Sequence, residues 1–173
     1  MLYKEHIAEE MVWLARQGCT FIGENLINAG RIYGTLDPIP LDKCIEMPVA
    51  ENLIMGSAIG MALAGALPVV VFQRMDFMTV AADAIINHLA LLPKLSGGQF
   101  NLPVIIRAII GSQDPAFVMG PQHNKDLTNV FNPSIATWEY HPGVYQEAFR
   151  QAFSILIVER KDLYETNCAS ATR

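Results

Sequence analysis

The sequence is poor in charge, and most of the charge that it has is negative. Only 17% of its 173 residues are Asp, Glu, Lys or Arg, and the net charge is −5 at pH 7. Such a chain lacks the basic surface that binds nucleic-acid phosphates or an anionic membrane. We therefore expect neither as a partner. Hydrophobic residues make up 51% of the chain, more than one core needs, which indicates that a subunit interface covers the excess.

Cysteine is scarce and its pattern is uninformative. The three cysteines, Cys19, Cys44 and Cys168, are widely spaced, and neither a CxxC pair nor a Cys/His cluster occurs. We expect free thiols in a reducing compartment and no structural zinc. The first ten residues carry acids and no long apolar core, unlike a secretory signal, so the expected location is the cytoplasm.

Several motifs that would identify a common enzyme class are missing. The sequence has no GxxxxGK[ST], no GxGxxG after a strand, no GxSxG and no HExxH. It also lacks a Gly-Asp-Gly motif with a following Asn, a combination that could bind a metal ion together with a diphosphate group. The four histidines show no metal-ligand spacing. We expect no metal ligands in this chain.

Residues 52–73 contain no charge over a length that could cross a bilayer. Pro68 interrupts the segment, and the pattern changes there from small helix-type residues to a Val-Val-Val run. A buried helix followed by a buried strand explains this change better than a membrane span, which remains the alternative.

Helix-type and strand-type patterns alternate along the whole chain. This alternation predicts an α/β fold, a three-layer sandwich with a mostly parallel sheet between helices. We expect a single domain, 1–173, with a frayed tail from about residue 161. The expected helices are 3–17, 51–65, 76–92, a short one after residue 123, and 143–152; the expected strands are 19–25, 43–47, 67–73, 102–110, 135–140 and 154–159.

Glu51 is the first candidate for a functional residue. It follows the strand 43–47 and begins an uncharged helix, so it lies where parallel sheets bind ligands. An ordinary helix N-terminal acid after Pro48 is the simpler interpretation. The helix dipole favours the anion by only about 0.3–1 kcal/mol, whereas burial can raise a carboxyl pKa by several units. A buried Glu51 would therefore share or donate a proton near neutral pH.

Three further features stand near this edge or on the same helix. Gly56 and Gly60, with Ala64, form a stripe that suits close helix packing, either within the subunit or as a two-fold self-contact with the same helix of a second copy. Gln73 and Phe77 flank the end of the third strand, although a lone Phe is by default a core residue. His123 lies in a Gly/Pro loop and could serve acid–base chemistry, although a lone loop histidine is more often simply solvated.

Taken together, these segments resemble a known family, the pyrimidine-binding (Pyr) domain of thiamine diphosphate enzymes. The closest version is the N-terminal half of the beta subunit of 2-oxoacid dehydrogenases of the pyruvate or branched-chain type. The resemblance covers residues 20–164 and rests on motifs that recur in order. They are Ile22-Gly23-Glu24-Asn25, Pro48-Val49-Ala50-Glu51, the Gly56/Gly60 helix, Met75-Asp76-Phe77, Ser96-Gly97-Gly98-Gln99, Leu102-Pro103-Val104-Ile105-Ile106-Arg107 and Gly120-Pro121-Gln122-His123.

The resemblance implies a role for each candidate. Glu51 would hydrogen-bond the cofactor's aminopyrimidine and favour the imino form that removes the thiazolium C2 proton. Phe77 would pack on that ring, Gln73 and Val49 would line its pocket, and His123 would lie near the reacting end. The cofactor would be thiamine diphosphate with Mg2+, the latter bound mainly by a separate diphosphate-binding, alpha-type subunit in a heterotetramer.

The resemblance also sets the expected reaction, decarboxylation of a 2-oxo acid with transfer of the acyl or aldehyde unit. The alternatives are transketolase-like ketol transfer and a non-catalytic structural or regulatory partner of the same fold. His88 and Leu91-Leu92-Pro93 replace more polar and basic residues of the family, and the sequence ends at Arg173, before the family's C-terminal domain. We therefore expect a free-standing enzyme outside a large dehydrogenase complex.

Overall fold

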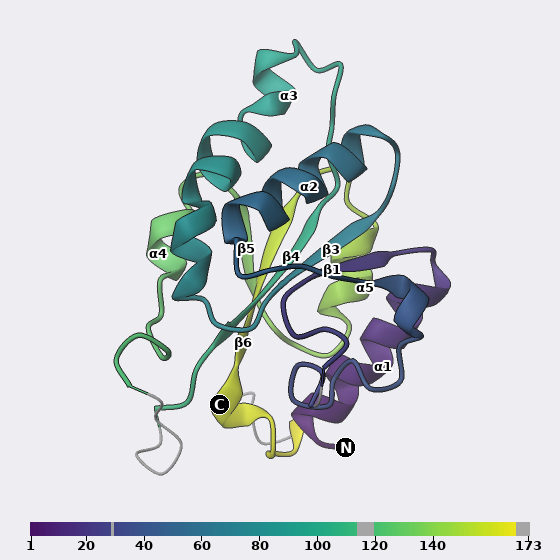
Figure 1. The fold of residues 1–173 in the computed structure, drawn as a ribbon, viewed down its shortest axis with the longest axis vertical. Helices are drawn as coiled ribbons and strands as arrows, with labels where there is room; N and C mark the ends of the chain where they lie inside the picture. The colour runs from purple at the N-terminus through teal and green to yellow at the C-terminus, as the bar shows by residue number, and fades with distance from the viewer. Residues whose placement is uncertain (29, 114–119, 169–173) are drawn as a thin grey trace.

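In the computed structural model, which describes residues 1–28, 30–113 and 120–168, six strands form one central sheet (Figure 1). The strand order is β2-β1-β3-β4-β6-β5, and all five neighbouring pairs are parallel. The strands are β1 (Thr20–Gly23), β2 (Cys44–Glu46), β3 (Pro68–Phe72), β4 (Ile105–Ile110), β5 (Ala136–Glu139) and β6 (Ile155–Arg160).

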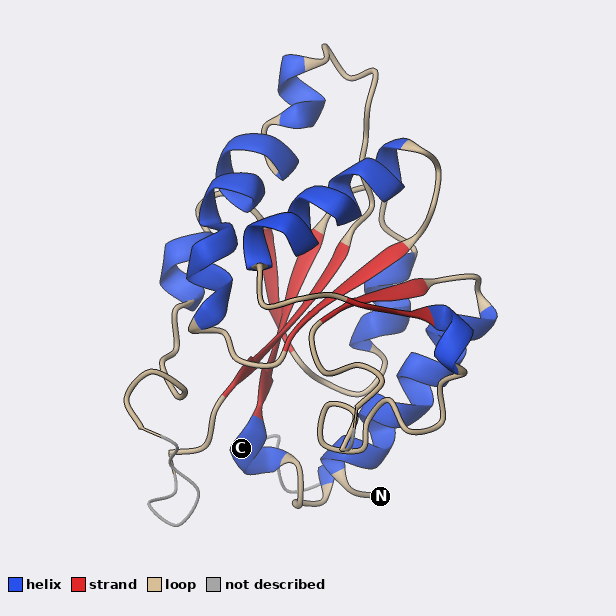
Figure 2. Ribbon diagram, in the orientation of Figure 1, coloured by secondary structure: helices blue, strands red, loops and turns tan. Residues whose placement is uncertain are grey.

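Helices cover both faces of this sheet (Figure 2). The α-helices are α1 (Tyr3–Arg16), α2 (Glu51–Leu63), α3 (Leu92–Leu95), α4 (Thr128–Phe131) and α5 (Val144–Phe149). Shorter turns of other helix types are η1 (Leu41–Lys43), η2 (Phe77–Ala81), η3 (Ala84–Leu89) and η4 (Lys161–Leu163). The predicted three-layer α/β sandwich is confirmed, and its sheet is parallel at every pairing of the described strands.

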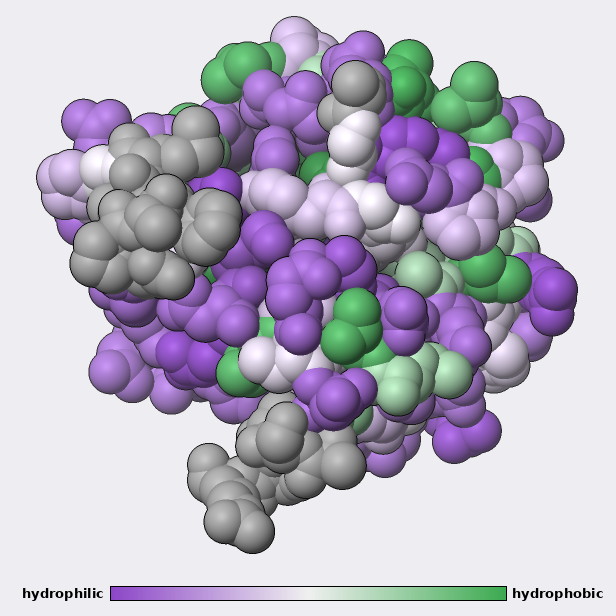
Figure 3. All heavy atoms as spheres, turned by 90° about the horizontal axis from the view of Figure 1, so that it is seen from below, coloured by the Kyte–Doolittle hydropathy of each residue, from purple (hydrophilic) through white to green (hydrophobic). Residues whose placement is uncertain are grey.

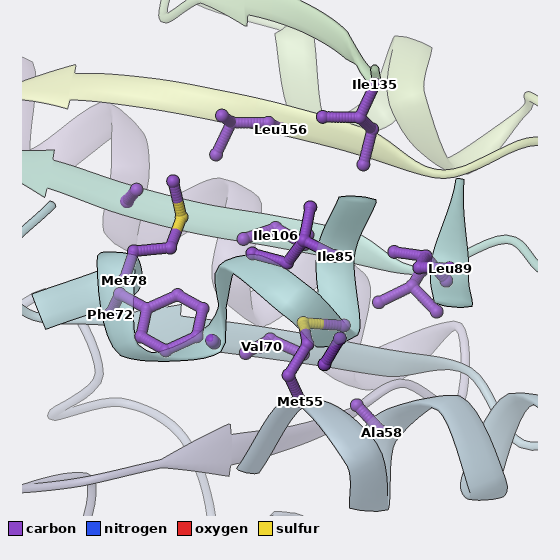
Figure 4. Packing of buried hydrophobic residues seen from close by; sticks show 14 of the residues in the cluster. Met55, Ala58, Val70, Phe72, Met78, Ile85, Leu89, Ile106, Ile135 and Leu156 are labelled. Carbon is purple, nitrogen blue, oxygen red and sulfur yellow. The ribbon is translucent and has the colours of Figure 1, made fainter. Parts of the chain in front are cut away.

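The core consists of two apolar layers, one on each face of the sheet. Successive strand residues point to opposite faces, so Val70 and Ile106 join the layer under α2, η2 and η3, whereas Val69 and Ile105 join the layer with α1 and α5. Figure 4 shows Met55 of α2 and Ile85 of η3 packed over Val70 and Ile106. Burial on both faces explains the uninterrupted apolar runs of the central strands.

The helix expected over residues 76–92 is wrong as a continuous α-helix. The chain forms the 3-10 turn η2, then the π turn η3, then the short α3. Met78 and Ala81 of η2 are buried against the sheet, and so are Ala84, Ile85 and Leu89 of η3. Packing against the sheet sets the winding here, and it overrides local helix propensity.

The expectation of a frayed tail from residue 161 is also wrong for residues 161–168. Tyr164 is fully buried, its hydroxyl donates a hydrogen bond to Glu159, and Leu2 forms an antiparallel bridge with Asn167. Leu2 and Asn167 are distant in sequence, so composition could not reveal their pairing. Residues 169–173 lie outside the described part of the chain.

The uncharged segment 52–73 consists of most of α2 followed by β3, as the interpretation as helix and strand predicted. Within the described residues, no helix has the length and apolar character that a membrane crossing requires.

Candidate active site

A pocket of about 190 Å³ opens beside the carboxyl ends of β1 and β3 and the first residue of α2. Seen from this end of the strands, where β6 also terminates, hydrophilic residues cover most of the molecular surface (Figure 3). The pocket walls combine acids, amides, a guanidinium and apolar rings. Its lining residues are Glu24, Asn25, Glu51, Ile54, Val71, Phe72, Gln73, Arg74, Phe77 and His123.

Glu51 occupies the first position of α2 and is only 7% exposed. Among the described residues, none donates a hydrogen bond to its carboxylate, so its oxygens are available to a ligand that enters the pocket. Glu24 lies on the same wall. Burial raises the pKa of Glu24, and the nearby charges of Glu51 and Glu46 raise that pKa further. The pocket therefore favours a ligand that supplies hydrogen-bond donors.

The loop that leaves β1 is fixed by a carboxylate from the neighbouring strand. Glu46 at the end of β2 accepts the backbone N–H groups of Asn25, Leu26 and Ile27 at 2.7, 2.7 and 3.1 Å. Asn25, held with φ at 60°, then donates its side-chain N–H to Gln73 Oε1 at 3.0 Å. This contact orients the Gln73 amide at the end of β3.

Arg74 contributes the positive charge of the pocket wall. Its Nη1 donates to the Gln73 carbonyl at 2.9 Å, and its guanidinium lies 5.0 Å from the centre of the Tyr33 ring. Burial lowers the pKa of Arg74. Glu24, Asn25 and Arg74 were not among the predicted site residues. The signal that could have found Glu24 and Asn25 is their place directly after a parallel strand.

Phe77 and His123 come together although 46 positions separate them. Their ring centres are 5.3 Å apart and the rings meet edge to face at 86°. The His123 Nδ1 atom is buried without a hydrogen-bond partner among the described residues. A buried nitrogen without a hydrogen-bond partner costs free energy unless a ligand or water supplies one. The His123 Nδ1 atom therefore indicates that the pocket binds a polar group of a ligand or a water molecule.

Three residues singled out in the sequence, Val49, Gly56 and Gly60, lie outside this pocket. Val49 is 73% exposed and contributes nothing to the lining, although it stands two residues before Glu51. Gly56 and Gly60 face outward from α2, and no atom lies within 4 Å of a Cβ built on either. Packing of this stripe within the subunit, one of the two expected alternatives, is therefore wrong for these glycines.

The pocket thus gathers Glu51, Gln73, Phe77 and His123, four of the five predicted site residues, at one edge of the parallel sheet. No group of three His, Cys, Asp or Glu side chains in the described ranges is arranged to hold a metal ion. The arrangement can bind a flat, donor-bearing ring between a carboxylate, an amide and an aromatic side chain.

Sequence comparison identifies the family of this fold and site. Residues 20–124 match the transketolase pyrimidine binding domain, and the chain belongs to that family. It is 32% identical over 130 residues to the acetoin:2,6-dichlorophenolindophenol oxidoreductase subunit beta of Cupriavidus necator, which covers 71% of this chain and 38% of that protein. It is also 35% identical over 131 residues to the pyruvate dehydrogenase E1 component subunit beta of Gracilaria tenuistipitata. That match covers 70% of this chain and 39% of that protein.

The predicted resemblance to 2-oxoacid dehydrogenase beta subunits is confirmed by these relatives. The matched region spans about two fifths of the length of the two curated relatives. Among solved structures, a split-gene transketolase described as an inactive beta4 tetramer superimposes with a TM-score of 0.66 at 16% identity, covering 91% of this chain and 51% of that one. At that identity the likeness shows the shared fold.

Proposed function

We propose that this chain is the pyrimidine-binding subunit of a split thiamine diphosphate enzyme, and that Glu51 binds the aminopyrimidine ring of the cofactor. The observation that carries the proposal is the Glu51 carboxylate, which is 7% exposed, has no donor among the described residues and faces the same pocket as Phe77. The single domain expected over residues 1–173 is part of this proposal.

The pocket fits the aminopyrimidine in shape and in chemistry. Phe77 and Ile54 offer apolar contact to a flat ring, the Gln73 amide offers a hydrogen bond at its edge, and Glu51 offers an acceptor. In this role Glu51 shares a proton with a ring nitrogen and so promotes loss of a proton from the exocyclic amine.

Thiamine diphosphate, when bound, supplies a nucleophilic carbon and an electron sink for decarboxylation of a 2-oxo acid. His123, whose buried Nδ1 has no hydrogen-bond partner among the described residues, would then orient the substrate or move a proton beside the reacting end. Val49, exposed next to Glu51, would complete the ring pocket only after a partner covers it.

The diphosphate and Mg2+ would be held by a separate alpha-type subunit, giving a heterotetramer whose cofactor lies at the interface. The relatives named above are themselves called beta subunits, which supports a partner. The exposed Gly56/Gly60 face of α2 supports close helix contact with another chain. The transketolase family match leaves ketol transfer as the second candidate reaction.

Calorimetric titration with thiamine diphosphate and Mg2+ tests this function. The chain co-purified with its diphosphate-binding partner should bind the cofactor tightly, whereas the chain alone should not. Absence of binding by a well-formed pair would contradict the enzyme and support the third possibility, a structural partner with the same fold.

A further inference from the structure

The Asp76 side chain makes a hydrogen bond to a loop that is distant from it in sequence. Asp76 stands just before η2, but its carboxylate makes no capping bond to that helix. Instead its two oxygens lie 3.3 and 3.2 Å from the backbone nitrogen of Lys125, 49 positions along the chain. Both carboxylate oxygens therefore share this one N–H, in a bifurcated hydrogen bond to a charged acceptor.

Other contacts anchor the same loop from both sides of His123. The Met75 sulfur accepts the Leu127 N–H at 3.2 Å, and the Gln113 side chain donates to the Asn124 carbonyl. Gly111, at the end of β4, lies so close that a Cβ built there would be 1.8 Å from the His123 carbonyl oxygen. The loop therefore rests on the ends of β3 and β4, and Asp76 supplies its charged contact.

We propose that Asp76 is a positioning residue that holds the His123 imidazole against Phe77 in the pocket. His123 precedes the clamped Lys125 N–H by two residues, and Phe77 follows Asp76 directly. One carboxylate thus links the two chain segments whose rings meet at 5.3 Å. This role rests on the proposed function for its catalytic meaning, whereas the clamp itself is a property of this chain alone.

The test begins on the full-length chain without a partner. Asp76→Ala should speed hydrogen exchange of the Lys125 amide about tenfold, the effect of losing one hydrogen bond to a charged group, and should weaken the nuclear Overhauser contact between the Phe77 and His123 rings. Asp76→Asn keeps an acceptor oxygen and should restore both readouts in large part.

Lys125→Ala is the matched control, because it removes the side chain and keeps the N–H that Asp76 binds. It should leave both readouts at the wild-type value. Asp76→Ser, whose side chain is too short to reach Lys125, replaces Asp76→Ala if that variant fails to fold. Wild-type exchange and an intact ring contact in Asp76→Ala, or an equal loss in Lys125→Ala, would overturn the proposal.

Titration of the assembled pair with thiamine diphosphate and Mg2+ separates this inference from the proposed function. Lys125→Ala should bind the cofactor as the wild type does, since it keeps the N–H that Asp76 binds. If the wild-type pair does not bind the cofactor, the enzyme assignment fails while the clamp measured by exchange still stands.

Discussion

Two polar clusters sit on the same parallel sheet and differ in how many of their hydrogen bonds the chain itself supplies. Arg107 of β4 is fully buried, and its Nε and Nη2 atoms donate hydrogen bonds to the Glu159 carboxylate at 2.7 and 2.9 Å. Nη2 also donates to the Thr35 hydroxyl at 2.8 Å. The hydroxyls of Tyr145 and Tyr164 donate to the same Glu159 carboxylate. Around the pocket, His123 Nδ1 has no hydrogen-bond partner among the described residues, as is also true of Arg107 Nη1. None of the described residues donates a hydrogen bond to the Glu51 carboxylate.

The contrast separates stability from binding. In the Arg107 cluster the ion pair compensates for burial: burial lowers the pKa of Arg107, but the Glu159 carboxylate outweighs it and raises that pKa above its usual value. Its bonds join β4, β6, α5 and the loop at Thr35 into one unit. The pocket cluster has polar atoms that remain available to a ligand, and it lies at the edge where parallel sheets bind ligands.

The largest expected effect comes from breaking the Arg107 cluster. Arg107→Met leaves Glu159 charged and buried without its cation, and should lower the free energy of unfolding by about 3–5 kcal/mol, measured by denaturant titration. Arg107→Met combined with Glu159→Gln should lose less than the sum of the two single variants. Additive losses would show that the two side chains do not act as a pair.

Glu10 tests a smaller buried cluster between α1 and α5. Its carboxylate accepts the Tyr140 hydroxyl and the N–H groups of Gly143 and Tyr145 at 2.8, 3.0 and 2.9 Å. Glu10→Gln presents an N–H₂ group to one of these donors and should cost about 1–3 kcal/mol of unfolding free energy. The exposed neighbour Glu9→Gln serves as the control and should change little.

The cost of Glu10→Gln should also depend on pH. Burial raises the pKa of Glu10 against the lowering effect of its three hydrogen bonds. The folded state therefore holds this proton more tightly than the unfolded state, and the stabilisation is fully present below the unfolded pKa of about 4.3. It is lost as pH rises through the raised folded pKa. The difference between wild type and variant should shrink over that window, and a constant difference would contradict the account.

The smallest effect concerns the exposed stripe of α2. Gly56 has a free Cβ position and no positive φ, so Gly56→Ala should stabilise the isolated chain by about 0.5–1 kcal/mol while weakening assembly with the partner subunit. Gly65→Ala is the matched control. It has the same free space but a φ of +86°, and should destabilise the chain. Thermal unfolding checks the sign of each change, and equal signs would refute this explanation.

The sequence predicted the strands within a few residues because burial on both faces leaves continuous apolar runs, as in Ile105–Ile110. It failed over residues 76–92, where the chain changes helix type, and at Tyr164, which contacts Arg107 across 57 positions. The same limit applies to the Arg107 and Glu159 pair, which β4 and β6 bring together across 52 positions.

The candidate site was predictable where strand ends mark it. Glu51 and Gln73 follow from that rule, and His123 followed from the resemblance. Asn25 also follows a strand end, but its contact with Gln73 depends on a loop that three N–H bonds fix to Glu46, about 20 residues away. Arg74 was missed because its stacking on Tyr33 appears only in three dimensions.

The most direct test of the central claim is the rate of C2–H exchange of thiamine diphosphate bound to the assembled pair. If Glu51 exchanges a proton with the aminopyrimidine, Glu51→Gln should slow this exchange by about 10²–10⁴-fold while the unfolding free energy of the chain changes little. Glu147→Gln, an exposed acid on α5, should exchange at the wild-type rate. Wild-type exchange in Glu51→Gln would contradict the role assigned to this carboxylate.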